Sequence, residues 1–198
     1  MGVSLDDVKK LKELTCLGLG DAKGALVEAD GDFDKALEAL RKKGLTKAEK
    51  KGDRETREGI IDSYVHSDRI GVVVEVNCET DFVARLPEFR EFAHQMAMQI
   101  AAMNPIYPTM EDVPADIYEA KKAELMAADD LSKKPEDIRE KIVEGQLKKH
   151  FAEQVLAEQP FVLDDSITVS ERIKQQVAKH GENLRVSQFK RIELGVTE

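Results

Sequence analysis

Five side chains that could transfer a proton or bind a metal ion lie near one another in the sequence. Cys78, Glu79 and Asp81 follow a strand-like run, and His66 and His94 lie on either side of it. A carboxylate paired with a histidine would supply a general acid and base. Cys78, Glu79 and His66 would offer three ligands to a metal ion, whereas a structural zinc site usually shows four ligands in recognisable pairs. Because acids and histidines are also common at strand ends, the pattern alone does not establish an enzyme.

The established catalytic and phosphate-binding motifs are missing from the sequence. It contains no GxxxxGK[ST] loop, no GxGxxG, no GxSxG and no HExxH. The two cysteines, Cys16 and Cys78, are far apart and neither lies in a CxxC pair, which favours reduced thiols over a disulfide. We therefore expect no catalytic residue, no metal ion and no cofactor.

An acid and an aromatic residue stand side by side at Asp81 and Phe82, within the string VNCETDFVAR. The strand pattern ends at about Asn77, and Thr80 is a suitable N-cap for a helix that follows. Two interpretations are open. Asp81 could simply favour the positive end of the new helix while Phe82 folds back onto the sheet, or the pair could face a partner.

Two β-rich runs precede this pair and predict a hairpin. Ile60 to His66 and Ile70 to Asn77 are rich in Val and Ile and are separated by Ser67-Asp68-Arg69. Apolar spacing predicts a long helix from Pro87 onward and a last strand over Leu184 to Leu194. Further helices are expected at about residues 114–128, 135–157 and 169–179. The main domain is thus predicted to be α+β, a small antiparallel sheet of about three strands faced by helices.

The first 44 residues show three short helical patterns. Asp21 and Asp32 are predicted to cap the second and third helices, and Gly44 is predicted to end the third. A domain this small buries a marginal core, so the intervening turn TCLGLG carries apolar side chains that the helices cannot all cover. Leu17 and Leu19 therefore either pack on the helices or face a partner.

A charged segment, residues 45–58, separates this helical domain (1–44) from the α+β core domain (59–198). Nine of its fourteen residues are charged. Its bases could contact RNA, but interleaved acids favour a solvated linker. The net charge of −9 falls entirely on residues 59–198, which argues against a free-standing nucleic-acid binder. The N-terminus is charged, and no apolar run approaches ~20 residues, so we expect a cytoplasmic protein whose partner is another protein.

The string TDFVAR, with its lead-in EVNCE, resembles the signature of the bacterial elongation factor Ts family, the guanine-nucleotide exchange factors of elongation factor Tu. Further strings match that family in order along nearly the whole chain: LKELTCLGLGDAKGAL, SYVHSDRIGVVVEVNCETDFVAR, AMNP, VEGQLKKHF, EQPFV and GENLRV. The resemblance implies an N-terminal ubiquitin-associated-like three-helix domain. It also implies that the protein binds elongation factor Tu carrying GDP and promotes GDP release without acting as an enzyme.

The resemblance implies contact residues position by position. Thr80, Asp81 and Phe82 match the segment that approaches the magnesium and phosphate site of elongation factor Tu, where the phenylalanine wedges between helices. The matching positions in the N-terminal domain are Lys9, Lys12, Leu19 and Gly20, although the turn from Cys16 to Gly20 departs from the family's usual sequence.

The resemblance also concerns assembly. His66, in the string SYVHSDRIGV, matches a second contact segment. Longer members carry two copies of the sheet-and-helix core, whereas this chain carries one, and short members resemble homodimers. Since an exposed edge strand would otherwise be left unpaired, we expect a homodimer.

Overall fold

Three strands form the main sheet, in the order β1, β2, β5. β1 (Glu58–His66) and β2 (Ile70–Cys78) form the predicted hairpin, and β5 (Arg185–Glu193) is the predicted last strand. On the central strand, alternate residues from Val72 to Cys78 are buried, whereas Val73 is exposed, so the sheet has one covered and one open face. The α+β class and the three-stranded antiparallel sheet predicted from the sequence are therefore confirmed.

Gly59 lets β1 and β2 approach closely near the end of β2. A Cβ added there would lie 2.3 Å from the backbone oxygen of Val76 and 2.8 Å from the Cα of Asn77. Its φ of +157° is also one that other residues rarely adopt. Both facts indicate that only glycine fits at this position.

Two helices follow the hairpin. α4 (Asp81–Ala84) is one turn long, and α5 (Pro87–Met103) begins at the proline that the sequence places in its first turn. On α5 the apolar stripe is fully buried, as its spacing predicts; it comprises Phe89, Phe92, Ala93, Met96, Ala97 and Ile100.

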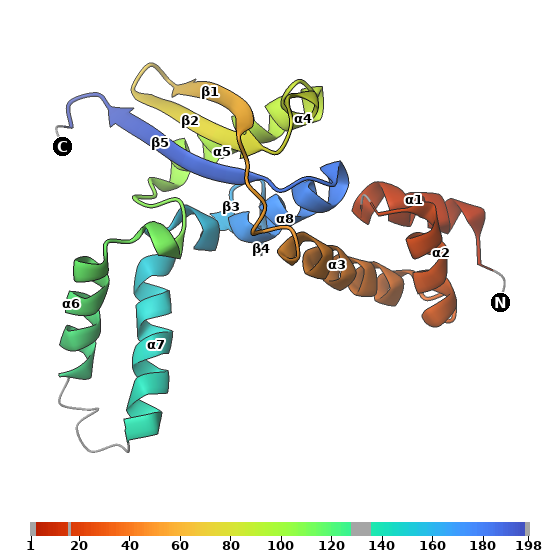
Figure 1. Ribbon diagram of the computed structural model, residues 1–198, viewed down its shortest axis with the longest axis horizontal. Coiled ribbons are helices and arrows are strands. Elements are labelled where there is room, and N and C mark those ends of the chain that lie inside the picture. The colour runs from red at the N-terminus through yellow and green to blue at the C-terminus, as the bar shows by residue number, and fades with distance from the viewer. Residues whose placement is uncertain (1–2, 16, 128–135, 197–198) are drawn as a thin grey trace. The chain divides into compact units, whose positions relative to one another are not determined.

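The N-terminal helices α1 (Leu5–Thr15), α2 (Leu19–Glu28) and α3 (Phe33–Glu49) pack around one apolar core (Figure 1). Asp32 caps α3 as predicted, because its carboxylate accepts the N–H of Lys35 at 3.1 Å. The predicted cap of the second helix is wrong. α2 begins two residues before Asp21, after Gly18, and Asp21 instead forms an ion pair with Lys43 at 2.9 Å.

The predicted end of the third helix at Gly44 is also wrong, because α3 continues to Glu49. Gly44 is buried, and a Cβ there would meet side-chain atoms of Ala178 and Leu17 at 3.9 and 4.0 Å. Ala48 is buried as well. Tertiary packing therefore carries the helix through a residue that would end it in isolation.

α6 (Ala115–Met126) and α7 (Glu136–Ala152) lie side by side as a helical arm (Figure 1). Their shared core contains Val143, Leu147 and Phe151, and the ring of Tyr118 stacks on Phe151 with centroids 5.8 Å apart. Short 3₁₀ turns flank the arm at Met110–Asp112 and Leu156–Glu158.

A second, two-stranded sheet was not predicted. It comprises β3 (Pro160–Phe161) and β4 (Asp164–Thr168), and it leads into α8 (Val169–His180). The buried amide of Gln99 holds it in place, donating to the carbonyl of Pro160 at 3.1 Å and accepting the N–H of Val162 at 2.7 Å. A buried polar side chain is tolerated here because its hydrogen bonds are satisfied.

The computed structural model describes residues 3–15, 17–127 and 136–196. The chain divides into two units: Met1–Asp62 with Glu75–Ala93 and Ser170–Ser187, and Ser63–Val74 with His94–Val169 and Gln188–Glu198. The main sheet and α5 contribute residues to both. Within the described ranges, no helix is long and apolar enough to cross a membrane.

Candidate partner-binding site

Phe82 stands out from α4 toward solvent. Its side chain is 81% exposed, whereas its neighbours Val83 and Ala84 are buried. Asp81, beside it, forms an ion pair with Arg85 one turn later, at 2.8 Å. The helix therefore buries its far side and leaves the aromatic ring uncovered. The interpretation in which Phe82 folds back onto the sheet is wrong.

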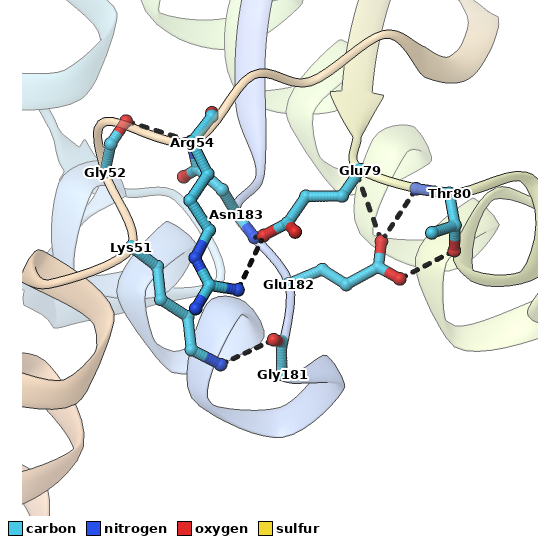
Figure 2. Close-up of polar contacts among 8 residues, drawn as sticks. All are labelled: Lys51, Gly52, Arg54, Glu79, Thr80, Gly181, Glu182 and Asn183. Atoms are coloured by element: carbon cyan, nitrogen blue, oxygen red, sulfur yellow. Dashed lines mark hydrogen bonds and ion pairs between the residues drawn. The ribbon is translucent and has the colours of Figure 1, made fainter.

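The backbone just before this pair is held by a carboxylate from far along the chain. Glu182 accepts the N–H of Glu79 at 3.1 Å and the N–H of Thr80 at 3.0 Å through one carboxylate oxygen. Its other oxygen accepts the hydroxyl of Thr80 at 2.6 Å (Figure 2). We call these three hydrogen bonds the Glu182 clamp. Thr80 is the N-cap residue of α4, as predicted, but its hydroxyl is used by Glu182 rather than by the helix.

The turn at residues 181–183, which contains Glu182, also binds residues 51–54 of the charged segment, just after α3. The side-chain amide of Asn183 donates to the carbonyls of Gly52 and Arg54, at 3.0 and 2.7 Å. Lys51 donates to the carbonyl of Gly181 at 2.5 Å. Figure 2 shows these contacts on one side of the turn and the Glu182 clamp on the other.

Glu79 joins the two sides of the turn. Its carboxylate accepts the backbone N–H of Asn183 at 2.6 Å and lies 3.5 Å from the guanidinium of Arg54. The two carboxylates thus bind each other's backbone segments. Glu182 accepts N–H groups of residues 79 and 80, and Glu79 accepts the N–H of Asn183. Hydrogen bonds to ionised acceptors are the stronger class, so this arrangement fixes the backbone from residue 79 to residue 80.

Cys78 lies directly before the clamp and is fully buried. Burial, reinforced by the nearby negative charge of Glu182, raises the pKa of its thiol to about 11. The thiol is therefore protonated at neutral pH, and its hydrogen goes to the carbonyl of Thr80 at 3.2 Å. A protonated, buried thiol suits neither a nucleophile nor a metal ligand. Cys16, the other cysteine, lies outside the described residues.

The acid/base and metal hypotheses gain no support from the structure. Glu79 is engaged by Asn183 and Arg54, and Asp81 by Arg85. His66 instead bonds the hydroxyl of Tyr64 at 2.9 Å. Among the residues that the structure describes, no group of three or more His, Cys, Asp or Glu side chains could hold a metal ion.

The N-terminal candidates lie on two helices that pack together. Lys9 and Lys12 are exposed on α1, and Leu19 and Gly20 form the first turn of α2 rather than the predicted loop. Leu19 is 52% exposed, whereas Leu17 is buried in the helical core. Of the two leucines whose roles were open, Leu17 therefore packs in the core and Leu19 faces solvent.

The bases of residues 45–58 are engaged within the protein wherever their contacts are described. Lys51 binds Gly181, Arg54 lies against Glu79, and Arg57 pairs with Glu55 at 2.5 Å. Lys50 is exposed, and the side chain of Lys47 lies outside the description. This pattern of internal pairing favours the linker hypothesis over the RNA-binding hypothesis. The segment is not the solvated linker that we expected throughout, because α3 continues to Glu49 and Lys51 and Arg54 bind other parts of the chain.

The residues near the candidate site that the sequence analysis did not single out are Glu182 and Asn183. The string GENLRV contains both, but it assigns them no role. Only the fold shows that they meet residues 79 and 80.

Comparison with known proteins agrees with the resemblance. The family model described as Elongation factor TS matches residues 38–196. The chain is 53% identical over 196 residues to Elongation factor Ts of Thermotoga petrophila, covering 98% of each chain. It is 50% identical over 196 residues to Elongation factor Ts of Fervidobacterium nodosum, with 98% of this chain and all of the relative covered. The chloroplastic Elongation factor Ts of Rhodomonas salina is 49% identical, with 98% and 89% covered.

Proposed function

The chain belongs to the elongation factor Ts family, and from this premise we propose that it is the guanine-nucleotide exchange factor of an elongation factor Tu. It would bind the GDP form of that GTPase, promote GDP release and so support translation elongation in the cytoplasm. The observation that carries the proposal is Phe82, a large apolar side chain left 81% exposed on a backbone that Glu182 holds in place. Exposed apolar side chains of this size are typical anchors of protein interfaces.

The proposed mechanism requires no covalent step. A GTPase holds GDP through a phosphate-cradling loop and a magnesium ion, and both tolerate little displacement. If Phe82 wedges between helices beside that site, the partner fits this protein best when those elements are displaced. Linkage then requires that this protein weaken GDP binding by the same factor by which GDP weakens this protein's binding. Asp81 would approach the magnesium and phosphate site from the same segment.

The N-terminal helices would supply a second contact with elongation factor Tu. Lys9, Lys12 and Leu19 are exposed and so available to a partner. Gly20 has no side chain and no neighbour within 4 Å of an added Cβ, so any contact there would be made by backbone alone. His66 is proposed as a contact to a different domain of the partner.

A homodimer is also part of the proposal. β1 and β5 are the edge strands of the main sheet, and they carry exposed apolar side chains such as Val65 (63% exposed) and Ile192 (72%). Such residues favour association with a second copy. Light scattering on purified protein should give twice the 22.2 kDa mass of one chain, whereas a single-chain mass would refute the dimer.

The exchange proposal is tested by stopped-flow release of a fluorescent GDP analogue from elongation factor Tu. Addition of this protein should speed release greatly, and the acceleration should saturate as a binding event does. Excess unlabelled GDP without this protein gives the intrinsic rate. An unchanged rate at saturating protein would refute the proposed function.

A further inference from the structure

We infer that Glu182 is a positioning residue for nucleotide exchange, which acts by holding the backbone that presents Phe82. The inference rests on the proposed function and assigns a role to a residue whose carboxylate is bonded within its own chain.

The Glu182 clamp holds the backbone at the N-terminal end of α4. One carboxylate receives three hydrogen bonds from two consecutive residues, Glu79 and Thr80, which end just before Asp81. α4 is only four residues long, so it has too few internal hydrogen bonds to fix its own direction. Its orientation therefore depends on its buried side chains and on what holds its two ends, and Glu182 holds the N-terminal end.

The side chain of Phe82 has little packing within its own chain. Being 81% exposed, its ring has almost no packing of its own to restrict where it points. An anchor of this kind loses binding energy if it must be ordered on contact, so preorganised backbone contributes directly to affinity. The buried neighbours Val83 and Ala84 pack one side of α4 against the protein, and the Glu182 clamp holds the backbone that leads into it.

The clamp also predicts which side chains are tolerated at position 182. An alanine would leave the two N–H groups and the hydroxyl without these acceptors. A glutamine would be tolerated, since its carbonyl oxygen can accept both N–H groups and its amide can donate to the hydroxyl of Thr80. Position 182 is thus expected to depend on hydrogen-bonding shape more than on charge.

The test is a double-mutant cycle in the GDP-release assay, with Glu182→Ala, Phe82→Ala and the double variant. Glu182→Ala should lower stimulated release roughly tenfold, because misplacing a binding group by about 1 Å can cost up to about a hundredfold. In the Phe82→Ala background the same change should have almost no further effect, which is the signature of one residue acting through another. Glu182→Gln should restore most of the rate.

Asn183→Ala is the matched control. It removes two hydrogen bonds of the same turn, those to Gly52 and Arg54, but leaves the Glu182 clamp intact. Its effect on the GDP-release rate should be the same with and without Phe82. In the Asn183→Ala, Phe82→Ala double variant, the two fold-reductions should therefore multiply. A merely structural role for Glu182 would make Glu182→Ala behave like Asn183→Ala in the cycle.

The outcomes separate the two proposals. If native protein speeds GDP release but the effects of Glu182→Ala and Phe82→Ala multiply, the positioning role is wrong and the exchange function stands. The positioning role is also wrong if the Glu182→Ala variant stimulates GDP release from elongation factor Tu as strongly as the native protein does. If native protein itself leaves GDP release unchanged, the exchange function fails, and the positioning role fails with it.

Discussion

Replacing Phe82 with alanine is expected to reduce stimulated GDP release about 30-fold or more. Interface anchors of this kind commonly carry ~2 kcal/mol or more of binding free energy, and each 1.4 kcal/mol corresponds to about tenfold. Because the side chain is 81% exposed in the isolated protein, its removal should change the free energy of unfolding by less than about 0.5 kcal/mol. Stopped-flow release and urea unfolding, run on the same preparations, measure the two quantities.

Leu163→Ala is the control for that experiment. Leu163 is also large, apolar and exposed (54%), but it lies between β3 and β4 and is not among the proposed contact residues. Its loss should leave GDP release as it is in the native protein. If Phe82→Ala and Leu163→Ala give the same release rate, Phe82 is not the anchor.

Gly59→Ala is expected to cost about 3 kcal/mol or more of unfolding free energy. The new Cβ would lie 2.3 Å from a backbone oxygen, so a strand must move rather than a flexible side chain. Overpacking against rigid neighbours typically costs 1 to 3 kcal/mol, and the unfavourable φ adds to it. The urea midpoint, at unchanged slope, reports the loss.

Gly71→Ala on the partner strand separates this clash from the general effect of placing alanine in a strand. A Cβ at Gly71 meets nothing within 4 Å. We expect a change of less than about 1 kcal/mol, and alanine could even stabilise by restricting the unfolded chain. Equal losses at the two positions would show that the close approach at Gly59 is not the cause.

Local patterns predicted the elements that depend on neighbouring residues. The hairpin, α5 and α8 each follow from a periodic apolar face with a turn or cap at its end, and the N-cap at Asp32 follows from one side chain and the N–H three residues on. These interactions lie within a few residues of one another. That is why the sequence alone could indicate them.

The errors arise where distant packing outweighs a local signal. Gly44 after three basic residues is a strong helix end, yet Gly44 is buried, with Ala178 3.9 Å from where its Cβ would stand, and α3 continues. The short β3 begins with a proline and has little strand pattern, and it is held by Gln99, about sixty positions earlier. The burial of Leu17 and the exposure of Leu19 likewise depend on how the three helices meet.

The candidate site divides in the same way. Asp81 and Phe82 could be singled out because an acid and an aromatic at a strand end are unusual, and the family resemblance implied their role. Glu182 could not, since an isolated glutamate after a glycine is typical of any exposed turn. The positioning role that we propose for it depends on hydrogen bonds to residues more than a hundred positions away.

Those long separations have a consequence for how the protein is made. The hydrogen bonds of the clamp join residues 102 and 103 positions apart, and those from Asn183 to the linker span 129 and 131. Contacts so distant in sequence form late, after the loops between them have closed. A nascent chain can therefore form its hairpin and α5 early, while Phe82 stays poorly oriented until residue 183 has left the ribosome. The proposed positioning of Phe82 is thus one of the last steps of folding rather than one of the first.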